Sequence, residues 1–194
     1  MVLVGKVNRE IVSAINMHGP LAVGVSGEDA GLILADIRDP KLGFVGDVTK
    51  VNAAILDRLL AENLIPVIST IGADGTGQSL NINADTVAGA IAAELTAEKI
   101  VYLSDVPGLL RDLDDLASLI THASTTEIRQ LIDDGIVAGG MIPKIDACLD
   151  AIGGGVKSAH LLDGRIPHVL LLELFTDAGI GTMITRPDDP EPSP

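Results

Sequence analysis

The chain has 194 residues and a formal net charge of −14, because 27 Asp and Glu outnumber 13 Lys and Arg. A field of this sign argues against nucleic acid and anionic membrane surfaces as partners, and no apolar run is long enough to span a bilayer. With 47% hydrophobic but only 2% aromatic residues, the core must be built from Val, Ile, Leu and Ala, which favours α/β architecture with buried parallel strands.

The first half of the chain predicts short buried strands that alternate with helices. Apolar residues at positions 7, 11, 12 and 15 follow the period of a helix over residues 5–16. Four strands and one helix are expected downstream, where Thr49 or Lys50 would open the helix. These segments are strands 21–25, 32–38, 43–48 and 65–70 and helix 51–63.

The stretch Asn81-Ile82-Asn83-Ala84-Asp85 joins a Gly-rich polar run to an apolar helical pattern. If the backbone is extended up to the helix start, Asn81, Asn83 and Asp85 project from one face. Asp85 also occupies the position expected of a helix N-cap. An ordinary Asx-rich turn with a capping Asp is the alternative interpretation.

The second half continues the same alternation. Strand 65–70, helix 85–96 and strand 99–103 predict a parallel βαβ unit, and ligands bind such sheets at the carboxyl ends of the strands. Thr125 or Thr126 is expected to cap a helix that ends near residue 134. The remaining expected elements are a helix with Pro143 in its first turn, strand 158–162, helix 167–175 and strand 182–185.

The only cysteine, Cys148, falls in the apolar helical run 142–152. A single cysteine permits no intrachain disulfide, so we expect a reducing compartment and a cytoplasmic protein. An inert thiol in the core is a better interpretation of this position than a nucleophile.

The run Gly139-Gly140-Met141-Ile142-Pro143-Lys144 has the components of a phosphate site, namely flexible backbone amides, a helix N-terminus and one Lys in its first turn. Its spacing is not that of a Walker loop. A plain connection between two helices with a solvated Lys144 is the alternative.

Three motifs in chain order, 81–85, 103–109 and 140–144, resemble the amino acid kinase family. Residues 5–8, 24–30 and 46–48 extend the resemblance, which covers nearly all of residues 1–186. It implies a three-layer αβα sandwich with a mainly parallel sheet. The likeness is greatest to the members that transfer the γ-phosphoryl group of ATP to the side-chain carboxylate of N-acetyl-L-glutamate in arginine biosynthesis.

The resemblance also implies roles for particular residues. Lys144 would stabilise charge on the transferring phosphoryl group, Asp85 would orient the catalytic lysines, and Asn81 would contact acetylglutamate with Asn83 nearby. Mg²⁺ would enter with the nucleotide. The residues implied to line the nucleotide are Ser104, Asp105, Val106, Pro107, Gly108, Leu109, Ile136, Val137 and Ala138. A carboxylate nucleophile needs no general base, so positioning and electrostatics would carry the catalysis.

Two later motifs, 160–165 and 173–182, resemble the branch of the family that is inhibited by L-arginine. This resemblance implies an effector site at His160, Glu173 and Gly179, in which Glu173 pairs with the guanidinium group. It also implies a homo-oligomer. Without the resemblance, His160 is a strand-end histidine and Glu173 an acid on a helix surface.

The sequence departs from the family in lacking its front third, with another catalytic Lys and the Gly-rich loops. Residues 1–80 would then be the remainder of the acetylglutamate-binding half, 81–186 the nucleotide-binding half and 187–194 a disordered tail. On this hypothesis the isolated chain has little kinase turnover and self-associates. The alternatives are another family member, such as a carbamate, uridylate, glutamate 5- or aspartate kinase, or a non-catalytic fragment that binds ATP or arginine.

Overall fold

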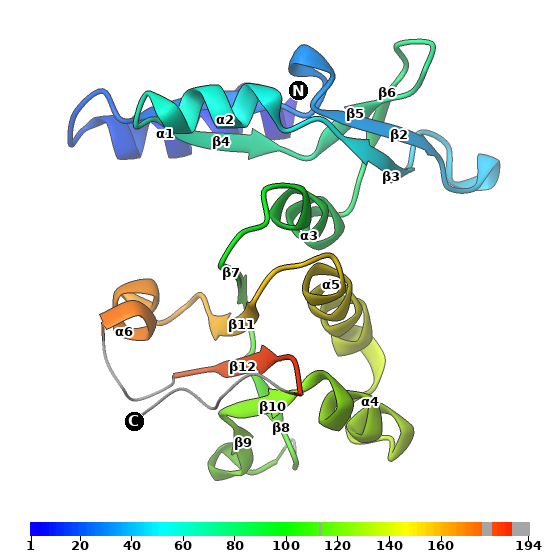
Figure 1. Cartoon of the computed structure of the whole chain (residues 1–194), viewed down its shortest axis with the longest axis vertical. Helices are drawn as coiled ribbons and strands as arrows, with labels where there is room; N and C mark the ends of the chain where they lie inside the picture. The colour runs from blue at the N-terminus through cyan, green and yellow to red at the C-terminus, as the bar shows by residue number, and fades with distance from the viewer. Residues whose placement is uncertain (113, 176–179, 188–194) are drawn as a thin grey trace. The chain divides into compact units, whose positions relative to one another are not determined.

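The structure of the chain, a computed structural model, describes residues 1–112, 114–175 and 180–187. The chain divides into two compact units, Met1–Leu95 and Thr96–Pro194, whose elements are labelled in Figure 1. Each unit has its own sheets and its own helices.

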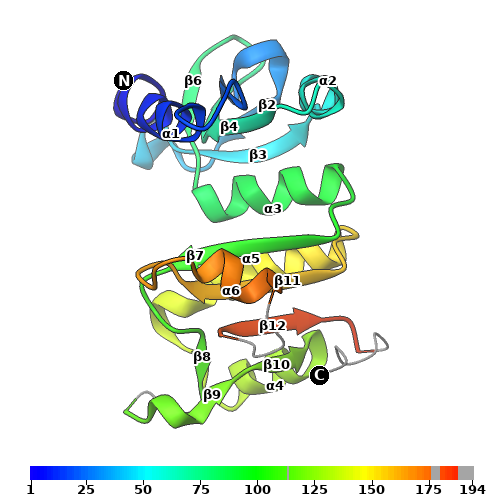
Figure 2. The same cartoon turned by 90° about the vertical axis from the view of Figure 1, so that its left-hand side faces the viewer.

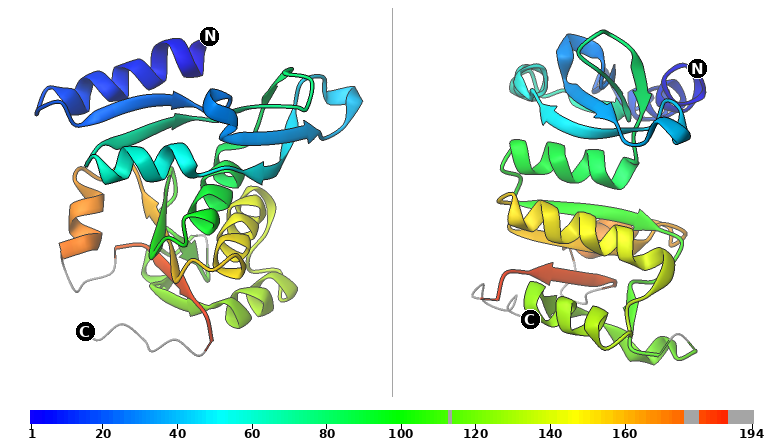
Figure 3. Two further views of the ribbon diagram at one scale, coloured as in Figure 1. Left: turned by 45° about the horizontal axis from the view of Figure 1, so that its top comes forward. Right: turned by 90° about the vertical axis from the view of Figure 1, so that its right-hand side faces the viewer.

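The first unit contains two sheets. Strands β1 and β4 pair in parallel, and a second, mixed sheet has the order β3-β2-β5-β6. Helices α1 and α2 lie on opposite sides of the β1/β4 pair (Figures 2 and 3). The elements are η1 Val2–Val7, α1 Asn8–Asn16, β1 Ala22–Ser26, η2 Asp29–Gly31, β2 Ile33–Ile37, η3 Pro40–Leu42, β3 Gly46–Val51, α2 Ala54–Ala61, β4 Ile65–Ser69, β5 Ile71–Ala73, β6 Ser79–Asn81 and α3 Ala84–Glu94.

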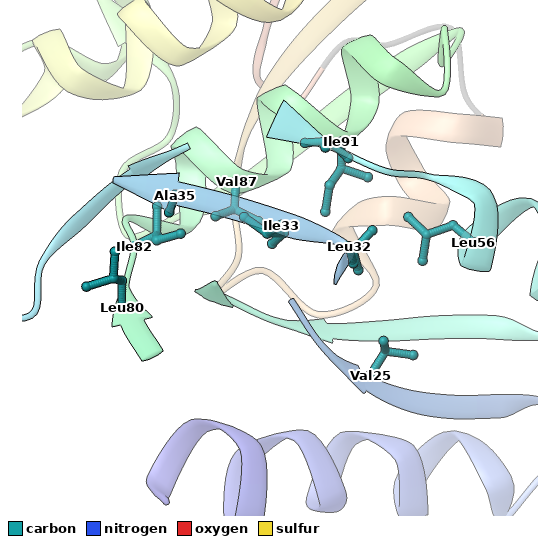
Figure 4. Close-up of a cluster of buried hydrophobic side chains, with 10 residues drawn as sticks. Val25, Leu32, Ile33, Ala35, Leu56, Leu80, Ile82, Val87 and Ile91 are labelled. Atoms are coloured by element: carbon teal, nitrogen blue, oxygen red, sulfur yellow. The ribbon is translucent and has the colours of Figure 1, made fainter. Parts of the chain in front are cut away.

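The core of the first unit is aliphatic, as the composition predicts. Leu32, Ile33, Leu56 and Leu80 are completely buried, and Figure 4 shows the cluster that they form with side chains of α3, including Val87. Burial of such side chains contributes about 2 kcal/mol each, so this cluster attaches α3 to the strands of its own unit.

The second unit has one main sheet with the order β10-β12-β11-β7. β11 pairs in parallel with β7 over six residues and in antiparallel with β12. Helices α5 and α6 lie on opposite faces of this sheet (Figure 1). The elements are β7 Lys99–Ser104, β8 Leu109–Leu110, η4 Leu116–Ser118, β9 Leu119–Ile120, β10 His122–Ser124, α4 Thr125–Asp133, η5 Gly139–Met141, α5 Ile142–Gly153, β11 Ser158–Asp163, α6 Val169–Phe175 and β12 Thr182–Thr185.

Helix α5 packs on the sheet through a continuous apolar face. Ile145, Cys148 and Ala151 on this face are fully or almost fully buried, and the Tyr102 hydroxyl of β7 donates to the Ala147 carbonyl at 3.3 Å. The prediction that Cys148 is a core thiol is confirmed.

The α/β fold class is confirmed, but one prediction of connectivity is wrong. β4 pairs with β1, and β7 pairs with β11, so the two strands of the expected βαβ unit lie in different sheets. The Gly-rich polar run between β4 and α3 forms a hairpin of β5 and β6.

Two predicted helix starts are also wrong. β3 stays paired with β2 as far as Val51, across a register shift between Leu34 and Ala35, and this pairing delays α2 to Ala54. Ser124, and neither Thr125 nor Thr126, caps α4, because its hydroxyl accepts from the Glu127 amide while the Glu127 carboxylate accepts from the Ser124 amide.

Within the described ranges, no helix combines the length and the apolar character needed to cross a membrane. The predicted disordered tail, 187–194, lies outside the described residues except for its first position.

Candidate functional site

The N-terminus of α3 is capped by Asn83, which corrects the prediction that Asp85 is the cap. The Asn83 side-chain oxygen accepts from the backbone amides of Asp85 at 2.9 Å and Thr86 at 3.1 Å. Asn83 has extended ψ of 133°, and the helix begins at the next residue. Asp85 therefore lies inside the first turn, where its half-buried carboxylate interacts favourably with the positive end of the helix dipole.

Asn81 ends β6 and is held through its backbone. Its amide donates to the Phe44 carbonyl at 2.8 Å, and its side chain is exposed. Because the strand stops at Asn81 and Asp85 is helical, the extended segment that was expected to align Asn81, Asn83 and Asp85 is not formed. The three side chains still lie within one short connection of the first unit.

Lys144 lies in the first turn of α5 as predicted, after Pro143. No side-chain hydrogen bond caps this helix at Met141. The preceding turn, η5, begins at Gly139, whose φ of 61° suits glycine. A half-buried cation next to an uncapped helix N-terminus is an arrangement that attracts anions.

The loop that leaves β7, Ser104 to Leu109, is anchored at its far end by a buried hydroxyl. Thr182 of β12 donates to the Ile120 carbonyl at 2.7 Å and accepts from the Leu109 amide at 2.8 Å. Gly108 has φ of 138°, and a Cβ there would lie 2.7 Å from the Thr182 hydroxyl oxygen. Only glycine fits this position without a shift of β12 or the loop.

The nearer part of the same loop is open to solvent. Ser104 is half-buried, its hydroxyl donates to the Asp105 carboxylate at 3.4 Å, and Asp105 is exposed. Val106 and Pro107 are half-buried. The loop therefore combines an accessible polar start with a fixed end.

The segment Ile136 to Ala138 closes the C-terminus of α4. The amides of Ile136 and Val137 both donate to the Leu131 carbonyl at 3.0 Å. Val137 is buried and Ala138 is exposed. Any ligand here meets the backbone at Val137 and not its side chain.

The first turn of α5, the loop Ser104 to Leu109 and the segment Ile136 to Ala138 lie at one edge of the second unit's sheet. A connection of only four residues, 154–157, joins α5 to β11, so the helix must run back antiparallel to the strand. A helix of 12 residues and a strand of six have similar lengths. The first turn of α5 therefore lies near the carboxyl ends of β11 and β7, and Figure 2 shows α5 alongside these strands.

Asp163 and Arg165 form a site feature at this edge that the sequence reasoning did not single out. The Arg165 Nε and Nη2 groups donate to the two Asp163 carboxylate oxygens at 2.9 and 2.8 Å, and the Arg165 amide donates to Oδ1 at 2.9 Å. The side-chain bonds, followed by the backbone bond, lower the pKa of Asp163 to about 2. The signal was an Asp-Gly-Arg turn directly after a buried strand.

His160 of β11 and Glu173 of α6, which were predicted as effector residues, contact each other. His160 Nδ1 donates to Glu173 Oε1 at 2.6 Å, and its Nε2 lies 3.0 Å from the Ser158 hydroxyl. The exposed fractions of the two side chains are 4% and 8%. Burial lowers the pKa of His160 below its ordinary value of 6.5, although the Glu173 carboxylate opposes the shift.

The interpretation of Glu173 as an ordinary helix-surface acid is wrong, since it is enclosed and also accepts from the Ile180 amide at 3.3 Å. Gly179, the third predicted effector residue, lies outside the described residues. Within those residues, no group of three or more His, Cys, Asp or Glu side chains is arranged to hold a metal ion.

Residues 1–163 match the family model described as the amino acid kinase family. The chain is 55% identical over 185 residues to acetylglutamate kinase from Nostoc punctiforme, which covers 95% of this chain and 62% of the relative. It is 50% identical over 197 residues to acetylglutamate kinase from Methanosphaera stadtmanae, with 95% and 66% coverage. The chain thus spans somewhat less than two thirds of the length of these curated relatives.

Solved structures share the fold. The smu.665 protein from Streptococcus mutans superposes with a TM-score of 0.77 at 26% identity, covering 95% of this chain and 69% of that one. N-acetylglutamate synthase from Neisseria gonorrhoeae, in complex with coenzyme A and L-arginine, has a TM-score of 0.74 at 25% identity, covering 92% and 45%.

Proposed function

Because the chain belongs to the amino acid kinase family, we propose that it carries acetylglutamate kinase activity. The reaction is the transfer of the γ-phosphoryl group of ATP, as its magnesium complex, to the side-chain carboxylate of N-acetyl-L-glutamate. The observation that carries this proposal is the 50 to 55% identity to curated acetylglutamate kinases over 95% of the chain. The product is an acyl phosphate, as arginine biosynthesis requires.

In this proposal, Lys144 contacts the transferring phosphoryl group. Its ammonium group at the start of α5 opposes the negative charge that spreads over the phosphoryl oxygens. The nucleotide lies along the loop Ser104 to Leu109 and the backbone of Ile136 to Ala138. Both segments belong to the same unit as Lys144.

Three residues between the end of β6 and the first turn of α3 have proposed roles, as the family resemblance implies. Asp85 orients the catalytic lysines, and Asn81 binds acetylglutamate through its exposed carboxamide. Asn83 uses its side-chain oxygen to cap α3, so its NH₂ group is the part that can donate to the substrate.

L-arginine is the inhibitor in this proposal, and a relative whose structure was solved with L-arginine supports it. Glu173 pairs with the guanidinium group, and His160 and Gly179 complete the site. Because His160 already occupies one Glu173 oxygen, the effector must share this carboxylate or displace the imidazole. We also propose a homo-oligomer, and a cytoplasmic location in which the buried Cys148 stays reduced.

The test combines two readouts on the purified chain. ADP release is coupled to NADH oxidation, and the acyl phosphate is trapped with hydroxylamine as a hydroxamate. We expect both signals with N-acetyl-L-glutamate and neither with L-glutamate, carbamate or UMP, at a turnover far below that of a full-length relative, because this chain spans 62% of the length of the Nostoc punctiforme kinase. Lys144→Gln should reduce turnover at least about a hundredfold, as loss of a charge-stabilising group does in other enzymes.

Lys157→Gln is the matched control, since it removes the same charge from a residue that pairs with Glu98 at the opposite end of β11. It should leave turnover unchanged. ATP binding without turnover on any acceptor would refute the kinase proposal for this chain and favour a nucleotide-binding fragment. Turnover with another acceptor would favour another member of the family.

A further inference from the structure

Arg165 pairs with Asp163 but leaves most of its own side chain in solvent. Its Nε and Nη2 groups are held by the Asp163 carboxylate, whose side chain is 11% exposed, whereas 65% of the Arg165 side chain is exposed. Nε–H and Nη2–H are enough to satisfy the buried carboxylate, so this structural role leaves the Nη1 group unused. A guanidinium has five N–H donors in a fixed plane. Its Nη1 edge, turned away from the carboxylate, is therefore oriented as a donor pair for another anion.

The Arg165 guanidinium is held next to the loop that follows β7. Asp163 is in register with Ser104, and the Gly164 amide donates to the Ser104 carbonyl at 2.8 Å. The Arg165 charge also interacts with Asp105. Arg165 thus lies beside the polar start of the proposed nucleotide loop, at the same sheet edge as the first turn of α5.

Three other cations of the second unit are placed away from this edge. Lys99 and Lys157 lie at the opposite, N-terminal ends of β7 and β11, where Lys157 pairs with Glu98. Arg186 donates to the carbonyl of Ile152, near the C-terminus of α5. In a chain with a net charge of −14, a polyphosphate needs local positive groups.

We propose that Arg165 is a nucleotide-binding residue that donates to the phosphate groups of ATP, and that Asp163 is the positioning residue that sets the orientation of the guanidinium. The proposal rests on the proposed function, in which the second unit binds ATP. Asp163 holds the Nε and Nη2 side of the guanidinium, which leaves the Nη1 N–H groups available to the ligand. Lys144 and Arg165 then share the phosphates from two sides of one sheet edge.

The experiment measures binding of ATP, ADP, AMP and adenosine by calorimetry to the wild-type chain and to three variants. Arg165→Gln should weaken ATP binding about tenfold or more, as expected for one charge-assisted hydrogen-bonded contact, and adenosine binding less than twofold. Arg165→Lys should retain part of the ATP affinity, because it keeps the positive charge but loses the planar set of N–H donors. The charge-matched control, Lys157→Gln, should bind all four ligands as the wild type does.

Asp163→Asn provides a second test of the positioning role. It leaves Arg165 in place but weakens the bidentate contact, so ATP affinity should fall less than in Arg165→Gln, and added salt should reduce the remaining affinity more steeply. Melting curves of all variants establish that each is folded at the temperature of the titration.

The outcomes separate the two proposals. If the wild type binds ATP and Arg165→Gln leaves the affinity unchanged, or weakens ATP and adenosine equally, the inference about Arg165 is wrong while nucleotide binding stands. If the wild-type chain binds no ATP, the proposed function and the inference are both wrong.

Discussion

Thr182→Val tests the hydroxyl that anchors the loop Ser104 to Leu109. Thr182 is completely buried, and its hydroxyl joins the Leu109 amide and the Ile120 carbonyl at 2.8 and 2.7 Å. Valine has nearly the same shape, so the change removes two hydrogen bonds without leaving a large cavity. Each buried group left unsatisfied costs about 1 to 3 kcal/mol, and we expect a loss of about 3 kcal/mol. For a unit of this size, the melting temperature should fall by at least about 10 °C.

The assay is urea unfolding followed by circular dichroism, with hydrogen exchange of the Leu109 amide as the local readout. Thr182→Ser keeps both hydrogen bonds and should lose about 1 kcal/mol for its missing methyl group. Thr49→Val, at an exposed position of β3, is the matched control and should change stability by less than about 0.5 kcal/mol. If Thr182→Val unfolds at the wild-type urea concentration and the Leu109 amide stays protected, the hydroxyl does not hold the loop.

Ser124→Ala removes the cap of α4 and should cost about 1 kcal/mol in urea unfolding, whereas an unchanged midpoint would mean that the capping box adds nothing. Burial lowers the folded-state pKa of His160 below 6.5. The contribution of this residue to the free energy of unfolding is therefore complete above pH 6.5 and is lost as pH falls from 6.5 through the folded-state pKa, and this pH dependence should be absent in His160→Asn. Gly181→Ala places a Cβ 2.0 Å from the Leu161 carbonyl oxygen and should cost at least about 3 kcal/mol. Gly153→Ala, with no atom within 4 Å of the added Cβ, should be neutral or slightly stabilising in the same melting experiment, and a large loss there would refute the steric argument.

Local patterns in the sequence predicted most of the buried elements. Strands β7, β11 and β12 and the helix that carries Lys144 lie within one or two residues of their predicted ranges. Their apolar runs are dense and are bounded by Gly, Pro or polar residues, so period and punctuation agree.

The failures have a common physical cause, which is competition between alternatives that are equally good locally. Asn83 and Asp85 are both suitable caps, and the choice depends on where β6 ends. Likewise, the start of α2 depends on how far β3 stays paired with β2. Neither limit can be read from a window of neighbouring residues, because both are set by strand pairing.

Contacts between distant residues were the least accessible part of the candidate site. The resemblance to the family supplied Lys144, His160 and Glu173 as residues of interest. It did not supply the enclosed His160 to Glu173 pair or the bond between Thr182 and Leu109, which are separated by 13 and 73 positions. Such pairs follow from which strands and helices lie side by side, and that arrangement is a property of the folded unit.

The single cysteine of α5 is a built-in chemical reporter. Cys148 is completely buried one turn after Lys144, so a thiol reagent can modify it only when the helix lifts away from the sheet. The modification rate of the unaltered chain therefore measures how often this part of the second unit opens. A nucleotide that binds at the start of α5 should slow the modification, which gives a mutation-free measurement of ligand occupancy.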